Sequence, residues 1–152
     1  MNKYINIYID DYSKSQLQTK YMLKGIDEVA YSKKMRSRIF YTLDSLLKKV
    51  GSEQGKKIVI IFAESKSKTE DVLESLSRAN IHPIFINSLF PNSTFSYSSI
   101  ILNYHDAVFD LVSMILKEHP FPIALLGHHE DSFTDQMRLE GFLDAVEEYK
   151  CP

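Results

Sequence analysis

The sequence predicts an α/β protein with three layers, in which a mostly parallel sheet has helices on both faces. Short apolar or β-branched runs alternate along the chain with segments whose apolar residues recur every three or four positions. Such alternation favours parallel strands joined by crossover helices. With 152 residues and no repeat or Gly/Ser-rich linker, the chain has the size of one domain, and we expect a single domain over residues 1–152.

The first half of the chain contains three predicted strands. Tyr4–Ile9 alternates β-branched and aromatic residues, residues 38–41 form a plausible short strand, and residues 57–63 contain an unbroken apolar run. Between the first two strands, residues 10–14 are polar and turn-like. The later part adds strands at residues 83–87, 99–102 and 123–126, the last bounded by Pro122 and Gly127 and typical of a strand covered on both faces.

Helices are predicted between these strands from apolar residues at helical spacing. The inward positions are Met22, Ile26, Val29 and Ala30; Leu43, Leu46, Leu47 and Val50; Val72, Leu73 and Leu76; Val108, Leu111, Val112, Ile115 and Leu116, expected to face the sheet; and Leu139, Phe142, Leu143, Val146 and Tyr149. Ser67 with Glu70 forms a capping-box pattern, and Ser132 or Thr134 can cap the last helix. Gly25 and Gly141 lie inside helices, where glycine costs about 1 kcal/mol relative to alanine, so we expect close packing there, of Gly141 against the sheet.

Charge is uneven along the chain. The net charge is −2, but residues 1–57 contain 12 Lys/Arg against 6 Asp/Glu, whereas residues 58–152 contain 6 against 14. Such asymmetry indicates either a basic contact face or an ordinary solvated helix surface around residues 33–38. The single cysteine, Cys151, allows no internal disulfide, and no signal-peptide core or membrane span is present, so we expect a cytoplasmic protein without a membrane partner.

Motifs for catalysis, metals and cofactors are missing from the sequence. The five glycines never cluster into a phosphate loop, and no serine or cysteine lies in a nucleophile elbow. His128 to Asp131 has adjacent histidines without a second cluster at ligand spacing, so a solvated loop is favoured over a metal site. A phosphate-accepting receiver requires a carboxylate after the third strand and a lysine after the last, where this chain has Ala63-Glu64-Ser65 and Gly127-His128. We therefore expect a protein that is not an enzyme, with no catalytic residue, metal or cofactor.

Residues 123–148, IALLGHHEDSFTDQMRLEGFLDAVEE, resemble the strand–loop–helix segment of lactose-repressor/galactose-repressor type regulators. The register holds without gaps, with His128 where the family usually has a second glycine. Three further segments, YMLKGIDEVAYSKK, RANIHPIFINS and IILNYHDAVFDLVSMIL, resemble units of the same family. The loop after the first strand does not.

The resemblance implies the N-terminal lobe of a periplasmic-binding-protein-like type I effector-binding domain, with strand order 2-1-3-4-5. The implied function is a ligand-sensing module of a bacterial transcription regulator, whose effector is a sugar or another small polar molecule. The family pairs through helices of this lobe, which implies a homodimer. The chain contains neither the helix-turn-helix nor the second lobe of the family, so DNA would be bound only by a domain outside it. The chain is then a fragment or the front of a regulator whose DNA-binding part comes later. A flavodoxin-like or receiver-like signalling domain and a dimerisation module without ligand remain alternatives.

The expected ligand contacts follow the ends of the strands, because ligands bind at the carboxyl edge of an open α/β sheet. They are Asp11, Tyr12, Ser13, Ser15, Asp44, Glu64, Asn103, Tyr104, Asp106 and His128. By gapless alignment, Asp106 falls where the repressor that gives the family its name has a sugar-contacting aspartate. A role for Asp106 at the start of a helix, near the positive end of the helix dipole, is the alternative. Tyr12 and Tyr104 are the expected stacking residues.

Overall fold

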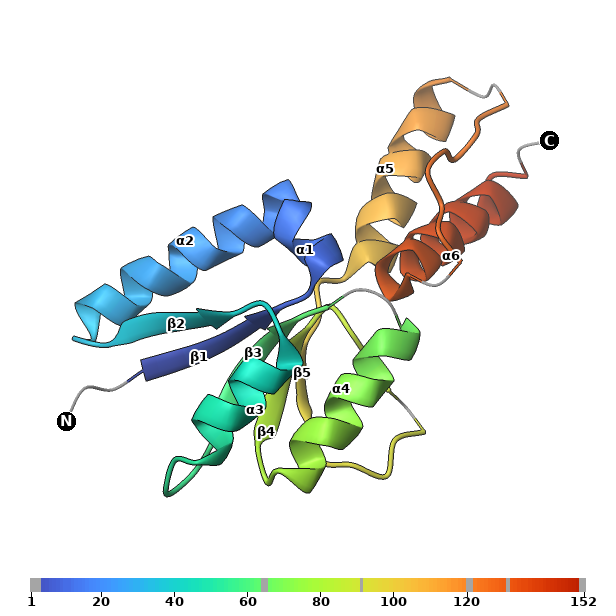
Figure 1. The fold of residues 1–152 in the computed structure, drawn as a ribbon. Coiled ribbons are helices and arrows are strands. Elements are labelled where there is room, and N and C mark those ends of the chain that lie inside the picture. The colour runs from blue at the N-terminus through green and yellow to red at the C-terminus, as the bar shows by residue number, and fades with distance from the viewer. Residues whose placement is uncertain (1–3, 64–65, 91, 120–121, 131, 151–152) are drawn as a thin grey trace. The chain divides into compact units, whose positions relative to one another are not determined.

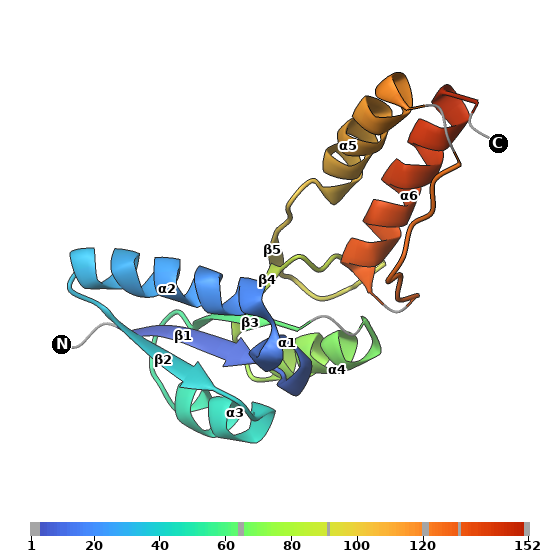
Figure 2. The same cartoon turned by 90° about the horizontal axis from the view of Figure 1, so that it is seen from above.

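The structure is a computed structural model that describes residues 4–63, 66–90, 92–119, 122–130 and 132–150. It consists of two compact units, Met1–Ile100 and Ile101–Pro152, and each is described by itself. Figures 1 and 2 show the elements of both units. That residues 1–152 together form one domain stays a prediction.

The first unit is built on a five-stranded parallel sheet. Its strands are β1 (Tyr4–Ile9), β2 (Arg36–Phe40), β3 (Ile58–Phe62), β4 (His82–Ile86) and β5 (Ser98–Ile100). Their order is β2-β1-β3-β4-β5, and every neighbouring pair is parallel. The predicted fold class and strand order are confirmed.

Helices cover both faces of this sheet (Figure 2). The residues Ile7, Ile9 and Phe62 pack against Met22, Leu23 and Ile26 of α2 (Leu17–Ser32) on one face. On the other face, Tyr8 and Val59 share a core with residues of α3 (Leu43–Gly51) and α4 (Lys66–Arg78). The alternation of side chains along β1 thus serves both layers. In α4, Val72, Leu73 and Leu76 are buried as predicted; the side chain of Ser67, the first residue of the predicted capping box, lies outside the described ones.

Three predictions for residues 10–30 are wrong. The expected polar turn after β1 is a short helix, α1 (Asp11–Ser15), because the Asp10 side chain caps its first turn. In α2, Val29 is 59% exposed, and a Cβ at Gly25 would meet nothing within 4 Å. Gly25 and Val29 are one helical turn apart and both lie outside the closely packed face of α2.

The second unit contains two helices, α5 (Tyr104–Glu118) and α6 (Phe133–Glu148). Val112 and Leu116 of α5 pack with Ala145 of α6, so the apolar face of α5 lies against α6. That α5 faces the sheet stays a prediction. Leu111 and Ile115, also expected to be inward, are 57% and 40% exposed. Ser132 caps α6 through the amide N–H of Asp135, as predicted.

The predicted strand at residues 123–126 is wrong. Residues 122–129 form neither helix nor strand; Ile123 packs against the helix pair, and Leu126 is 89% exposed. An apolar run becomes a strand only where another strand satisfies its backbone N–H and C=O groups, and within the described part of the chain no strand pairs with it.

Gly141 is closely packed, as predicted, but against a helix and not the sheet. A Cβ built on it would overlap the backbone carbonyl of His105 on α5. The absence of a side chain at Gly141 therefore sets how closely α6 approaches α5.

Candidate functional site

The carboxyl end of β1 carries a capped turn that orients two polar side chains. Asp10 Oδ1 accepts a hydrogen bond of 2.7 Å from the Ser13 amide, and Asp10 is only 9% exposed. The Asp10 amide in turn donates to the carbonyl of Phe62, which fixes the end of β1 against β3. Hydrogen bonds of the backbone amides of Asp10 and Ser13 therefore hold this turn in place.

Both side chains keep polar atoms without partners. Ser13 is 1% exposed, and neither its Oγ nor Asp10 Oδ2 forms a hydrogen bond with any described residue. An unsatisfied buried polar atom costs about 1–3 kcal/mol. Buried groups of this kind at the carboxyl edge of a parallel sheet are candidates for contact with a ligand or an ordered water.

Ser13 is one of the residues that line a small hollow of about 20 Å³ at this edge. The hollow lies where β3 and β4 end, and its lining comes from α1, the first half of α2 and the ends of these strands: Ser13, Gln18, Thr19, Met22, Phe62, Ala63, Ile86 and Asn87. Such a volume holds about one water molecule or one hydroxyl group. It can receive a part of a small polar ligand, not a whole sugar ring.

Two carboxylates, Asp10 and Asp11, lie near the phenol of Tyr8 at this edge. Burial raises the pKa of Tyr8, and the charges of Asp10 and Asp11 raise it further. Because ionised carboxylates only accept hydrogen bonds, they favour a ligand group that donates hydrogen bonds.

The other predicted residues of the first unit lie near the surface. Asp11 begins α1, Tyr12 is 51% exposed, and the Ser15 hydroxyl donates to the Tyr12 carbonyl at 2.8 Å. Asp44 is exposed in the first turn of α3. Glu64 lies outside the described residues. The structure thus brings Asp11, Tyr12, Ser13 and Ser15 together on α1.

The predicted residues of the second unit gather at the start of α5, except for His128. Asn103 is the N-cap of α5: its Oδ1 accepts from the Asp106 amide at 3.2 Å, and its Nδ2 donates to Asp106 Oδ2 at 2.5 Å. The Tyr104 ring lies under the Arg138 guanidinium, 4.6 Å from its centroid. His128 is exposed in the irregular segment before α6.

Asp106 is also tied to a histidine that sequence analysis did not single out. His105 Nδ1 lies 2.8 Å from Asp106 Oδ1, and its Nε2 lies 2.9 Å from Asp144 Oδ2 on α6. Hydrogen bonds with Asp106 and then Asp144 raise the pKa of His105, whereas bonds with His105 and then Asn103 lower the pKa of Asp106. His105 therefore joins α5 to α6, and Asp106 contacts the other nitrogen of its ring, which gives Asp106 a structural role beside the proposed role in ligand binding.

Three residues of the carboxyl edge, Asp10, Thr19 and Asn87, were not among the predicted ligand contacts. Thr19 is 5% exposed on α2, and Asn87 follows β4 with a φ of 58°. A signal for Thr19 was present, because this hydroxyl occupies the inward face that Met22 and Ile26 continue. For Asn87 the signal was an amide at the end of a predicted strand.

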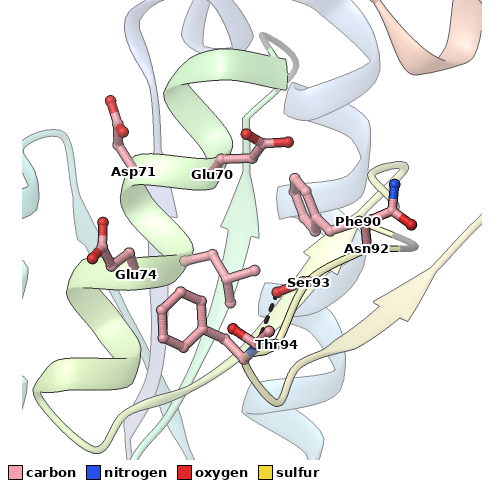
Figure 3. Close-up of a pocket in the computed structure, with 9 residues that line it drawn as sticks. Glu70, Asp71, Glu74, Phe90, Asn92, Ser93 and Thr94 are labelled. Carbon is pink, nitrogen blue, oxygen red and sulfur yellow. Dashed lines mark hydrogen bonds between the residues drawn. The ribbon is translucent and has the colours of Figure 1, made fainter.

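A wider pocket of about 480 Å³ lies between α4 and the loop after β4. Figure 3 shows Glu70 extending toward Phe90 of that loop, whereas Asp71 and Glu74 extend to the other side of α4. Glu74 already pairs with Arg78 at 2.5 Å. Because no buried polar atom without a partner lines this pocket among the described residues, we place the candidate ligand site at Ser13.

The described ranges contain neither a metal-site cluster nor a membrane-spanning helix. No three His, Cys, Asp or Glu side chains in those ranges converge as a metal site, and no helix there is both long and apolar enough to cross a membrane.

Comparison with known proteins gives a result for structure only. No protein-family model matches the sequence, and no curated protein matches it. Among solved structures, transcription regulator CcpA of Lactococcus lactis matches 99% of this chain and 56% of its own, with a TM-score of 0.75 and 13% identity. The fold evidence therefore does not depend on close sequence similarity.

Two further solved structures agree with this match. A LacI family transcriptional regulator from Mycobacterium smegmatis has a TM-score of 0.74 at 16% identity, over 97% of this chain and 52% of its own. The transcriptional regulator CelR in complex with cellobiose has a TM-score of 0.74 at 12% identity, over 99% and 49%. The chain therefore has the α/β fold of LacI-family transcription regulators and spans about half the length of these neighbours.

Proposed function

We propose that this chain is the ligand-sensing part of a transcription regulator and that it binds a small hydroxyl-bearing effector without catalysing a reaction. The observation that carries the proposal is the buried hydroxyl of Ser13, which has no partner among the described residues and belongs to a residue that lines a hollow at the carboxyl edge of the sheet. A solved neighbour of the same fold is a regulator in complex with cellobiose, which supports a sugar as the effector class.

The chemistry of the edge favours a polyol. A hydroxyl placed in the hollow can accept a hydrogen bond from Ser13 Oγ, or donate one to it, since a serine hydroxyl does both. Asp11 and Tyr12 lie on the same short helix as Ser13, so that helix also carries a carboxylate and an aromatic ring. The other predicted ligand contacts also stay proposals. They are Ser15, Asp44 and Glu64 in the first unit, and Asn103, Tyr104, Asp106 and His128 in the second.

We also propose a homodimer formed through α2. The outward side of this helix exposes Leu17, Tyr21 and Tyr31 by 63%, 68% and 86%. These residues recur at helical spacing, and Lys24 and Glu28 lie between them on the same side. A twofold contact presents the same surface from both subunits, so an antiparallel pair of α2 helices places Lys24 of each subunit toward Glu28 of the other.

The proposal also covers DNA binding and location in the cell. We propose that a separate DNA-binding domain recognises the operator sequence. We propose the cytoplasm as the location, because the one cysteine suits a reducing compartment. Binding by this chain alone is expected to be weak, with a Kd of roughly 1 mM or about −4 kcal/mol.

Thermal unfolding with a panel of mono- and disaccharides tests the proposal. At a concentration of about 20 times the Kd, a bound sugar stabilises the folded state by roughly 2 kcal/mol, which is measurable as a rise in Tm. Ser13→Ala should abolish or strongly reduce this rise. Ser113→Ala removes another buried hydroxyl without a partner, in α5, and should leave the rise unchanged. A panel without any effect, or an equal rise with Ser13→Ala, contradicts the proposed site.

A further inference from the structure

Charge is divided between the two units of the chain. Residues 1–100 contain 15 Lys/Arg against 10 Asp/Glu, and residues 101–152 contain 3 against 10. The first unit is therefore basic although the whole chain has a net charge of −2. Within it, the basic residues are not spread evenly.

Two cations mark the amino-terminal edge of the sheet. Arg36 begins β2 opposite Tyr4 of β1. On the other side of β1, Asn6 pairs with Val59, so Lys57 stands level with Tyr4 just before β3 begins. Adjacent strands are about 4.8 Å apart, which places the backbones of Arg36 and Lys57 roughly 10 Å from each other along this edge.

Lysines at the connections into the same edge add to these cations. Lys33 and Lys34 follow the end of α2, Lys48 and Lys49 lie in the last turn of α3, and Lys56 lies in the loop before β3. Figure 1 shows both connections, α2–β2 and α3–β3, at the end of the sheet where the strands begin.

The exposed cations of this edge are not neutralised by carboxylates. In the described part of the chain, none of the following six forms an ion pair: Lys33, Lys34, Arg36, Lys48, Lys49 and Lys56. Glu53, the acidic residue of the α3–β3 connection, already pairs with Arg38. The helix dipole explains why lysines occur at positions 48 and 49, in the last turn of α3. It does not explain Arg36, which begins β2, or Lys56, which lies in the loop before β3.

A hollow of about 400 Å³ opens at the same edge. Its lining residues include Lys56, Lys57 and His82, together with Ser77 and Ser96. Lys57 Nζ donates to the Gly51 carbonyl at 2.6 Å, which holds one ammonium group in place beside the hollow. Cations and hydroxyls around an open hollow match the oxygen atoms of a phosphate.

We propose that the amino-terminal edge of this sheet, defined by Lys33, Lys34, Arg36, Lys48, Lys49, Lys56 and Lys57, binds the phosphate backbone of double-stranded DNA without reading its sequence. Duplex DNA carries one charge per ~1.7 Å of its axis, so a row of flexible lysines can meet several phosphates at once. The charges and their positions require only a polyanion; the choice of DNA over an acidic protein rests on the proposed role in transcription.

Fluorescence anisotropy with a labelled duplex of arbitrary sequence tests this inference over a range of salt concentrations. The logarithm of the association constant should fall linearly with the logarithm of the salt concentration, with a slope of about −0.9 per phosphate contacted. The fourfold variant Lys33→Gln/Lys48→Gln/Lys49→Gln/Lys56→Gln should reduce the magnitude of this slope by up to about 3.6 and weaken binding by roughly tenfold or more at low salt.

The matched control is Lys14→Gln/Lys20→Gln, which removes two exposed lysines, one from α1 and one from the first turn of α2, away from this edge and should change the slope by much less than half of the fourfold effect. Circular dichroism verifies that each variant is folded. The inference is overturned by absence of binding at low salt, by a proportional loss in the control, or by tighter binding of poly-glutamate than of DNA. Because no effector is present, failure here leaves the sugar-binding test unaffected, and failure of that test leaves this result unaffected.

Discussion

The backbone of Gly141 on α6 lies directly against the carbonyl group of His105 on α5, and no side chain fits between them. A Cβ at position 141 would overlap the carbonyl oxygen and lie 3.0 Å from the carbonyl carbon and 3.1 Å from the Cα of His105. On either side of this contact, the imidazole of His105 bonds with Asp106 and Asp144. One residue of α5 thus contacts α6 through its backbone and its side chain together.

Gly141→Ala should destabilise the α5–α6 pair by about 1–3 kcal/mol, although alanine favours a helix by about 1 kcal/mol. The atom in the way is backbone, which cannot rotate aside as a side chain can. Gly25→Ala is the matched control, because its Cβ meets nothing and should stabilise α2 by about 0.4–1 kcal/mol. Urea unfolding followed by circular dichroism measures both. Equal effects of the two substitutions would refute the close approach.

Ser13→Ala should raise the stability of the ligand-free protein while it removes ligand binding. Replacing a buried hydroxyl without a partner relieves a desolvation cost of about 1–3 kcal/mol. Ser113→Ala should give a similar rise without any effect on ligand binding. A loss of stability on Ser13→Ala would show that its hydroxyl is already satisfied, for example by an ordered water.

The stabilisation from His105 should depend on pH in a stated direction. Its pKa is raised above 6.5 by Asp106 and Asp144, so this stabilisation is complete below pH 6.5 and is lost as the pH rises through the raised value. Asp106 has a pKa below 3.8, so its contribution is present above pH 3.8 and is lost as the pH falls through the lowered value. Asp144→Asn should lower the pKa of His105, measured by NMR titration of the imidazole. Asp110→Asn, elsewhere on α5, should leave it unchanged; equal shifts would contradict the ion pair.

Tyr21→Glu should convert the proposed dimer into a monomer, because it places a charge in the exposed apolar side of α2. Analytical ultracentrifugation over a range of protein concentrations measures the association. Leu111→Glu, at a residue of α5 that is 57% exposed, is the control and should leave the dimer intact. A wild-type protein that stays monomeric at high concentration rules the dimer out.

The sheet could be predicted from sequence because its signals are local and repeated. The residues of β1 alternate between two apolar cores, and β3 is an apolar run; both patterns follow from burial on two faces. The strand predicted at residues 123–126 has the same local pattern, but a strand also requires a neighbour for its backbone, and one sequence does not reveal whether that neighbour exists. Leu126 is exposed for this reason.

The same limit applies to side chains. Gly25 and Gly141 both occur inside amphipathic helices, yet only Gly141 contacts another backbone, and the difference depends on which element faces it. At the candidate site, Ser13 was predicted from its place after β1, but its burial and lack of a partner depend on the capping bond from Asp10, since that bond creates α1. Asp10 itself was missed as a site residue because a carboxylate after a strand serves several different chemistries.

The two borders of the sheet have a consequence for aggregation. β5, at one border, has only three residues, and β2, at the other, carries Arg36 and Arg38. The guanidinium of Arg38 donates to Asn6 Oδ1 on the adjacent strand, with Nε 2.9 Å away, and pairs with Glu53 at 2.7 Å. A short strand offers few backbone groups to an incoming chain, and like charges on β2 repel a second copy. Neither border is therefore a template for fibril growth, and crowded or concentrated protein should stay free of edge-to-edge stacking.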